Sequence, residues 1–170
     1  MSIMPEKELV RKLKEIIKKE VFVTKAEHKI ISVRGTESNW LFDFRNVLLK
    51  PEPLDLIAEI FWKHFEDKYP FQVGGQETSA LPLVAAVVMK SKQRGRPVNG
   101  FFMRKSRKKD GLQRVVEGTL TDEKIILIDD LLNSGRTINH QVEVLGNLNR
   151  KVDTSFVLLG FRDLNVYDFI

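Results

Sequence analysis

Short apolar runs alternate along this chain with longer stretches in which apolar residues recur every three or four positions. The first pattern is typical of buried strands and the second of amphipathic helices. The expected helices cover Lys7–Glu20, Pro53–Glu66, Leu81–Lys92 and Arg136–Asn149, and the expected strands cover Val21–Val33 (with a turn), Trp40–Phe44, Phe71–Val73, Val98–Met103, Glu117–Leu120, Ile125–Ile128 and Thr154–Gly160. Such alternation implies a parallel sheet covered by helices on both faces, and therefore predicts an α/β fold.

Size and composition limit the classes of protein to consider. The chain has 170 residues without repeats or linkers, so we expect one domain over residues 1–170. It has no cysteine, which excludes disulfides and thiolate–metal sites and favours a cytoplasmic location. No stretch reaches the roughly 18 apolar residues of a membrane span, and the N-terminus lacks the apolar core of a signal peptide. We therefore expect neither a membrane protein nor a secreted one.

The net charge of +5 comes from one short segment. Residues 104–109, RKSRKK, hold five of the 28 basic residues, and the remaining ones balance the 23 acidic residues. Such a run can be a solvated surface, a nuclear-import patch or a nucleic-acid contact. Here it lies between two expected strands, across from a candidate phosphate-binding turn. That position favours a small anionic ligand, so a nucleic-acid partner is not expected.

The strongest expected strand, Ile125–Ile128, runs directly into two carboxylates, Asp129 and Asp130. In open α/β sheets, ligands bind beyond the carboxyl ends of the strands, where these acids are expected to lie. Two adjacent acids repel a phosphate, so their partner would be the hydroxyl groups or the metal ion beside one. The alternative interpretation is an ordinary strand end with solvated acids.

The residues after the acid pair, NSGRT at 133–137, form a turn that opens the last expected helix. Small residues let backbone N–H groups approach an anion, and the helix N-terminus contributes its positive dipole end. Ser134 and Thr137 can add hydroxyl donors, and Arg136 a charge. The glycine and lysine spacing of a nucleotide-triphosphate P-loop is absent. Together, the turn and the acid pair predict a phosphorylated sugar as ligand.

The whole segment IILIDDLLNSGRTI resembles the signature of type I phosphoribosyltransferases. In that family the two acids bind the ribose hydroxyls of phosphoribosyl pyrophosphate (PRPP), and the following turn holds its 5′-phosphate. Further segments resemble the orotate phosphoribosyltransferases, which transfer the phosphoribosyl group to orotate. They are SNWLFDFR (38–45), GGQETSALPLV (74–84), FMRKSRKKDG (102–111) and the arginine of GFRDL, Arg162.

This resemblance implies a type I phosphoribosyltransferase fold, with a five-stranded parallel core under a hood made from about residues 1–50 and the C-terminal end. It also implies a homodimer in which the basic loop, 104–111, reaches the neighbour's site. Mg²⁺ would arrive with PRPP and lie near the acid pair. The implied PRPP-binding residues are Thr78, Ser79, Asp129, Asp130, Asn133, Ser134, Gly135, Arg136 and Thr137. The implied catalytic residues are Arg104, Lys105 and Lys108 with Asp129 and Asp130, and the implied base-binding residues are Leu41, Phe42, Asn133 and Arg162.

Some ligand-facing positions depart from the orotate-enzyme pattern. Asp110 stands where a histidine is usual in the basic loop. Ser79 and Ala80 stand where glycines or a lysine are usual, and Asn133 replaces a threonine. These departures leave two alternatives open: a protein of the same fold that binds PRPP or nucleotides as a regulator, and a transferase for another heterocyclic acceptor.

Overall fold

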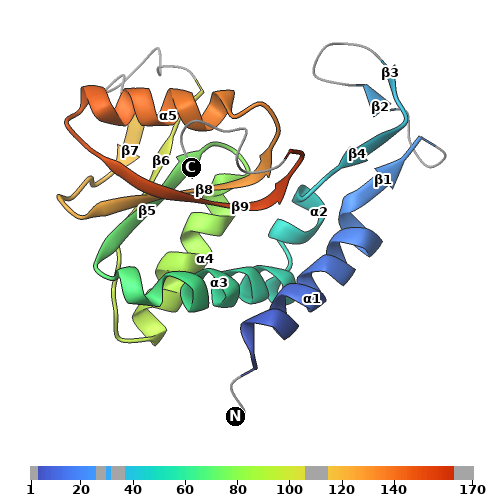
Figure 1. Ribbon diagram of the computed structural model, residues 1–170, viewed down its shortest axis with the longest axis horizontal. Coiled ribbons are helices and arrows are strands. Elements are labelled where there is room, and N and C mark those ends of the chain that lie inside the picture. The colour runs from blue at the N-terminus through green and yellow to red at the C-terminus, as the bar shows by residue number, and fades with distance from the viewer. Residues whose placement is uncertain (1–3, 26–29, 32–36, 106–114, 163–170) are drawn as a thin grey trace.

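The structure is a computed structural model that describes residues 4–25, 30–31, 37–105 and 115–162. At its centre is a five-stranded sheet in the order β7-β6-β5-β8-β9 (Figure 1). The strands are β5 (Phe71–Gln76), β6 (Gly100–Met103), β7 (Val116–Gly118), β8 (Lys124–Leu132) and β9 (Val152–Gly160). Helices cover both faces of this sheet. One face is covered by α1 (Glu6–Ile16), α3 (Pro51–Phe65) and α4 (Ala80–Gln93), and the other by α5 (Arg136–Asn147). The predicted α/β fold with helices on both faces is confirmed.

The expectation of a fully parallel core is wrong for one strand. Strands β5, β6, β8 and β9 run parallel, whereas β7 pairs with β6 in the antiparallel direction. Only residues 104–115 separate the two strands, a connection near the lower limit for a parallel crossover, whereas an antiparallel pair can be joined by a short one. The sheet is therefore mixed and mostly parallel.

Two strands extend further than their sequence pattern predicts. Strand β8 continues through the acid pair to Leu132, because β9 pairs with it up to the contact of Leu132 with Gly160. Strand β5 includes Gly74 and Gly75, although a break was expected there. A Cβ at Gly74 would lie 2.2 Å from the Phe101 ring, and one at Gly75 would lie 2.2 Å from the Ile128 carbonyl oxygen. These glycines permit close packing between strands, so the chain remains extended.

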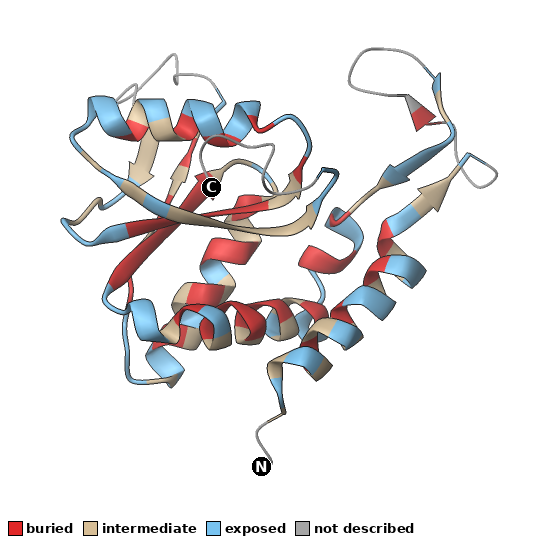
Figure 2. Ribbon diagram, in the orientation of Figure 1, coloured by how far each residue is buried: buried red, intermediate tan, exposed pale blue. Residues whose placement is uncertain are grey.

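Alternate residues of β8 enter two separate hydrophobic cores. Ile126 and Ile128 join the core under α1, α3 and α4, and Ile125 and Leu127 join the smaller core under α5. Figure 2 shows the resulting burial along β5 and β8. A strand buried on both faces needs apolar residues at every position, which explains the continuous run IILI. The two cores together hold the carboxyl end of β8 in place.

The segment between α1 and α3 projects from the sheet on the side where β9 ends (Figure 1). A π-helical turn, Ile17–Val21, continues α1 into β1 (Phe22–Thr24), which pairs with β4 (Trp40–Phe42). Strands β2 (Ile30–Ile31) and β3 (Glu37–Ser38) form a second antiparallel pair, and α2 (Arg45–Leu48) leads back toward the sheet. We call residues 22–45 the hood segment. Among the described residues, none of the helices has the length and apolar character needed to cross a bilayer.

Candidate active site

The two acids of β8 occupy different environments. Asp129 is only 8% exposed, and one of its carboxylate oxygens accepts a hydrogen bond from the Asp130 backbone N–H at 2.9 Å. The Asp130 carboxylate is half-buried and accepts a hydrogen bond from the Ser79 hydroxyl, also at 2.9 Å. Ser79 is the N-cap of α4. The structure thus places the loop after β5 directly beside the acid pair, as the resemblance predicts.

The pKa of Asp129 is raised to about 7, first by burial and then by a side-chain hydrogen bond with Asp130 and the negative charge of that residue. The backbone N–H of Asp130 and the positive charge of Lys105 act in the opposite direction. Asp129 therefore exchanges a proton near neutral pH. A ribose hydroxyl or a cation placed beside it would favour the ionised form.

The raised pKa predicts a pH dependence of stability. The folded chain keeps the Asp129 proton up to about pH 7, whereas an unfolded aspartate loses it near 3.8. The stabilising contribution of the Asp129 proton is therefore fully present below pH 3.8, and it is lost as the pH rises from there to about 7. We expect the free energy of unfolding of the wild type, relative to Asp129→Asn, to fall across this window. Urea unfolding of both proteins over this pH range measures the difference, and a flat difference would contradict the assignment.

The turn after β8 leads into α5 through Gly135, whose φ of 78° lies in the left-handed region that favours glycine. Gly135 is the N-cap of α5, and no side chain caps the helix there. The first backbone N–H groups of α5 therefore have no side-chain cap from Gly135, and such groups at a helix N-terminus can bind an anion. Ser134, Arg136 and Thr137 around them are exposed. The structure brings this turn to the same edge of the sheet as the acid pair, as predicted.

The first two residues of the basic segment start beside the loop after β5. The Lys105 backbone N–H donates to a Glu77 carboxylate oxygen at 3.1 Å, and the Glu77 N–H donates to the Met103 carbonyl at 2.8 Å. The Arg104 Nε is buried and, among the described residues, has no hydrogen-bond partner. Thr78, next to Glu77, is exposed. Lys108 and Asp110 lie outside the described residues.

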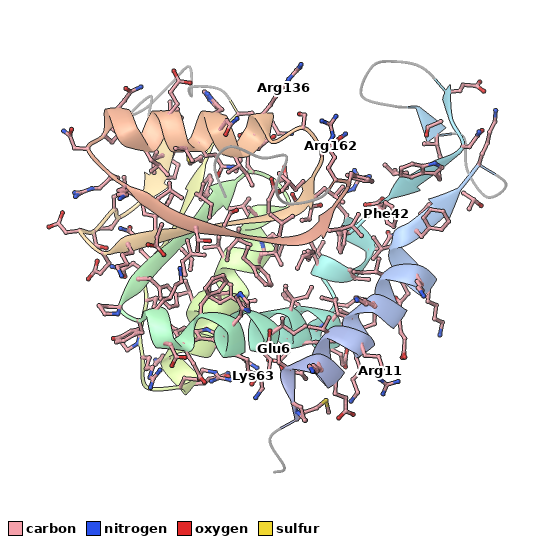
Figure 3. The ribbon with its side chains drawn as sticks, viewed as in Figure 1. Glu6, Arg11, Phe42, Lys63, Arg136 and Arg162 are labelled. Carbon is pink, nitrogen blue, oxygen red and sulfur yellow. The ribbon has the colours of Figure 1, made fainter. Side chains whose placement is uncertain are left out.

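The expected base-binding residues come from separate parts of the chain. Leu41 and Phe42 are neighbours on β4, so their side chains point to opposite faces. Phe42 packs against Phe161, with ring centroids 5.8 Å apart, and Arg162 follows at once. Figure 3 shows Arg162 at the end of β9 on the side of the hood segment that carries Phe42. The structure thus brings Phe42 near Arg162, whereas Leu41 faces away from Phe42.

Sequence reasoning missed two features around these residues. Phe22 and Trp40 join Phe42 and Phe161 in one partly exposed aromatic cluster. Arg45 holds Asp43 through two hydrogen bonds of 2.7 and 2.9 Å, and this pairing raises the pKa of Arg45, with a smaller contribution from Asp130. The spacing of Asp43 and Arg45 in FDFR could have suggested this pair.

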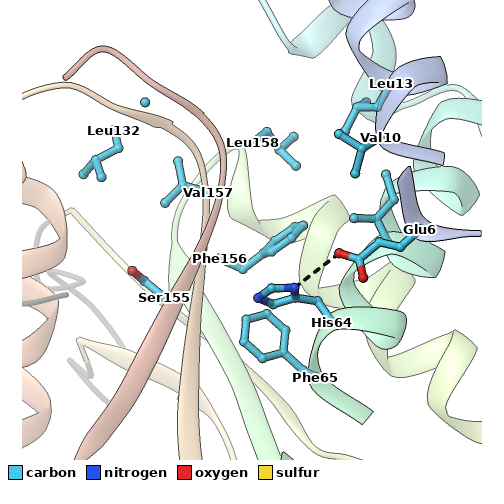
Figure 4. Close-up of a pocket in the computed structure, with 12 residues that line it drawn as sticks. Glu6, Val10, Leu13, His64, Phe65, Leu132, Ser155, Phe156, Val157 and Leu158 are labelled. Carbon is cyan, nitrogen blue, oxygen red and sulfur yellow. Dashed lines mark hydrogen bonds and ion pairs between the residues drawn. The ribbon is translucent and has the colours of Figure 1, made fainter. Parts of the chain in front are cut away.

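A cavity of about 330 Å³ lies away from the acid pair, between α1, α3 and β9 (Figure 4). Its walls are mostly apolar, with Phe65, Phe156 and Leu158 among them, and His64 contacts Glu6 at 3.3 Å at its edge. None of the predicted ligand-binding residues that the structure describes lines it. Within the described part of the chain, the candidate site is therefore the open surface at the carboxyl ends of β5 and β8, and this apolar cavity is a separate feature.

Known proteins resemble this chain in sequence and in fold. No family model matches the chain. An orotate phosphoribosyltransferase from Bradyrhizobium sp. (strain ORS 278) is 28% identical over 153 residues, which cover 87% of this chain and 81% of that protein. A phosphoribosyltransferase from Corynebacterium diphtheriae has a similar structure, with a TM-score of 0.74, 22% identity and coverage of 95% of this chain and 88% of that one. Orotate phosphoribosyltransferase from Mycobacterium tuberculosis H37Rv, in complex with Fe(III) dicitrate, gives a TM-score of 0.73 at 22% identity and covers 92% and 85% of the two chains.

The fold is that of the type I phosphoribosyltransferases. The sequence is similar to those of the orotate phosphoribosyltransferases. The resemblance and the fold predicted from the segment IILIDDLLNSGRTI are therefore confirmed.

Proposed function

We propose that the chain transfers the phosphoribosyl group from PRPP to orotate, giving orotidine 5′-monophosphate and pyrophosphate, with Mg²⁺ as cofactor. One observation carries the proposal: the acid pair of β8, the uncapped N-terminus of α5 and Ser79 meet at one edge of the sheet. The name of the Bradyrhizobium relative supports orotate as the acceptor. A Mycobacterium tuberculosis orotate phosphoribosyltransferase has been solved in complex with PRPP, and its structure resembles this chain at a TM-score of 0.63.

In this proposal each part of PRPP meets a group of suitable charge. Ser134, Arg136 and Thr137, with Asn133 and Gly135 in the same turn, hold the 5′-phosphate, and the acid pair holds the ribose hydroxyls. As the bond from C1′ to pyrophosphate breaks, positive charge develops on the ribose near the two carboxylates. Negative charge develops on the pyrophosphate beside Thr78, Ser79 and the basic loop. Fixed charges that match a developing charge distribution are usually the largest catalytic contribution.

The residues present suit a magnesium ion that arrives with its substrate. The described residues contain no group of three or more acidic or histidine side chains that could hold a metal by themselves. Mg²⁺ commonly binds through one or two carboxylates together with substrate phosphates, and Asp129 and Asp130 can supply these carboxylates. Once bound, the ion would offset the charge of the leaving pyrophosphate.

The wider proposal includes a single domain over residues 1–170, a cytoplasmic location and a homodimer. In the dimer, loop 104–111 would close over the neighbour's site, exclude water and bring Lys105 and Lys108 to the pyrophosphate. Pyrophosphate release from PRPP and Mg²⁺, measured with a panel of nucleobases, tests the function. Turnover with orotate supports the proposal. PRPP binding without turnover on any base would favour a regulator, and preference for another base would favour a different acceptor.

A more specific prediction concerns Arg162. The orotate carboxylate can accept two parallel hydrogen bonds from a guanidinium group, which a lysine cannot reproduce. We expect Arg162→Lys to raise the KM for orotate at least tenfold, on the order of one lost charge-assisted hydrogen bond, while PRPP affinity stays nearly unchanged. Uracil lacks the carboxylate and should be a poor substrate of the wild type.

Steady-state kinetics with each base and calorimetry with PRPP supply these values. Arg136→Lys is the matched control, because Arg136 lies in the phosphate turn and should instead affect PRPP. An unchanged orotate KM in Arg162→Lys, or a wild-type preference for uracil, would exclude this role of Arg162.

A further inference from the structure

The loop after β5 is bonded to the ends of both neighbouring strands. Strand β5 lies between β6 and β8, and its pairing with β6 ends at Gln76 and Met103 (Figure 1). One residue later, the Glu77 N–H still donates to the Met103 carbonyl at 2.8 Å. On the other side of the loop, the Ser79 hydroxyl donates to the Asp130 carboxylate. The loop therefore joins the strand that ends in the basic segment to the strand that carries the acid pair.

The Glu77 side chain takes the place of a backbone partner for β6. Successive N–H groups of a strand point to opposite neighbours, so those of Arg104 and Lys105 face different sides. The Arg104 N–H donates to the Val115 carbonyl at 2.8 Å, on the side of β7. On the side of β5 the chain has already turned into the loop, and there a Glu77 carboxylate oxygen accepts from the Lys105 N–H at 3.1 Å. Glu77 thus extends the pairing of β6 by one residue.

This hydrogen bond holds the backbone from which the Lys105 ammonium extends. The Lys105 side chain is exposed, and a lysine ammonium lies at the end of a flexible four-carbon stem. The region that the ammonium can reach is therefore set by the position of its backbone. Burial dominates the raised pKa of Asp129, and the charge of Lys105 acts against it, so Lys105 lies within electrostatic range of the acid pair. Fixing its backbone keeps the ammonium beside the candidate site.

The charge of Glu77 does not by itself suit this place. Glu77 is half-buried and directly precedes Thr78 and Ser79, the residues proposed to meet the pyrophosphate. A negative charge there repels an anionic ligand. A side chain with an acceptor oxygen at the distance of a glutamate carboxylate is, in contrast, what the Lys105 N–H requires. The length of the side chain and its acceptor oxygen therefore explain the residue better than its charge does.

We infer that Glu77 is a positioning residue for the transfer reaction: by accepting the hydrogen bond of the Lys105 backbone, it sets where the Lys105 ammonium meets the departing pyrophosphate. The inference rests on the proposed function, because it gives Glu77 a part in that reaction. Glu77 acts through Lys105 and need not touch the substrate. The activity should accordingly depend on the reach of the side chain at this position and not on its charge.

Two conservative substitutions separate reach from charge. Glu77→Gln keeps the length and an acceptor oxygen and loses the charge, whereas Glu77→Asp keeps the charge and is one methylene shorter. We expect Glu77→Gln to retain kcat within about threefold and Glu77→Asp to lose roughly 10- to 100-fold, the scale of a small misplacement of a group that acts on the substrate. Kd for PRPP should change less than kcat. Glu123→Asp is the matched control, because Glu123 is exposed just before β8, at the opposite end of the sheet, and this variant should behave as the wild type.

Two measurements test the same contact without catalysis. Amide hydrogen exchange followed by NMR should be about tenfold faster for Lys105 in Glu77→Asp than in the wild type or in Glu77→Gln, since the hydrogen bond protects that amide. Calorimetry with inorganic pyrophosphate and Mg²⁺ should show weaker binding to Glu77→Asp. Free pyrophosphate carries the full charge of the leaving group, so its affinity depends on where the ammonium lies.

The opposite pattern, with activity lost in Glu77→Gln and kept in Glu77→Asp, would overturn the inference and indicate that the carboxylate binds a cation. Unchanged kcat, Lys105 exchange and pyrophosphate affinity in Glu77→Asp would overturn it as well. A wild type that transfers to no base would refute the proposed function separately. Amide exchange and pyrophosphate binding then decide whether Glu77 positions Lys105, with wild-type values in Glu77→Asp overturning that role.

Discussion

Replacing Asp129 and Asp130 together by asparagine is expected to weaken PRPP binding by about 2–4 kcal/mol, the scale of lost charge-assisted hydrogen bonds. This corresponds to roughly 30- to 1,000-fold in Kd. Asparagine keeps the size of the side chain, and its amide oxygen can still accept from Ser79, which donates to Asp130 in the wild type. It cannot supply the negative charge that the ribose hydroxyls and Mg²⁺ would meet. Isothermal titration calorimetry with PRPP and Mg²⁺ measures the change.

Two controls separate a binding effect from misfolding. Thermal unfolding should show that the double variant remains folded. Burial opposes a charge on Asp129, so a neutral asparagine at this position should not destabilise the fold. Asp67→Asn alters an exposed acid far along the chain from the site, in the short 3₁₀ helix after α3, and should bind PRPP as the wild type does. A folded double variant with wild-type affinity would remove these acids from the ligand site.

Replacing Lys105 by alanine is expected to lower kcat about 100- to 1,000-fold, the range seen when one preorganised charge-stabilising group is removed. The Lys105 backbone is held by Glu77, and its charge lies close enough to Asp129 to affect the pKa of that acid. Its amine would therefore meet the pyrophosphate mainly as negative charge develops there. We expect Kd for PRPP to change much less than kcat. Single-turnover kinetics and calorimetry separate the two quantities.

Lys124→Ala is the matched control, because Lys124 is an exposed lysine at the opposite end of β8. Equal losses in kcat and in PRPP affinity would instead indicate that Lys105 binds the ground state. Mixing Lys105→Ala with Asp130→Asn protomers tests whether the loop crosses between subunits. Activity recovers on mixing only if Lys105 of one subunit and Asp130 of the other form one composite site, so recovery would show that the loop crosses between subunits.

The local patterns predicted most of the sheet because each depends on neighbouring residues. The run IILI reads as a strand buried on both sides, and the spacing of Ile138, Val142 and Leu145 reads as one face of a helix. Both depend on side-chain periodicity alone, and both agree with the structure. The acid pair and the NSGRT turn are adjacent in sequence, so their proximity at the site could also be predicted.

The features that the sequence did not reveal depend on contacts between distant residues. Strand β8 passes through two acids because its partner β9 supplies hydrogen bonds on that side. Strand β5 continues through two glycines because Phe101 and Ile128 occupy the space that side chains would need. The hydrogen bond of Ser79 to Asp130 joins residues 51 positions apart. Single-residue propensity cannot report such pairings, since it contains no information on neighbours in space.

The two tryptophans differ sharply in their surroundings, and this gives the protein two separate optical reporters. Trp62 is fully buried, and its indole N–H donates to the Val87 carbonyl at 3.1 Å, so α3 and α4 enclose it. Trp40 is 46% exposed in the hood segment and packs against Phe161. A dissolved quencher such as iodide would reach Trp40 and leave Trp62 emitting. Shielding of Trp40 would then follow movement or covering of the hood, while the emission of Trp62 would follow global unfolding in the same sample.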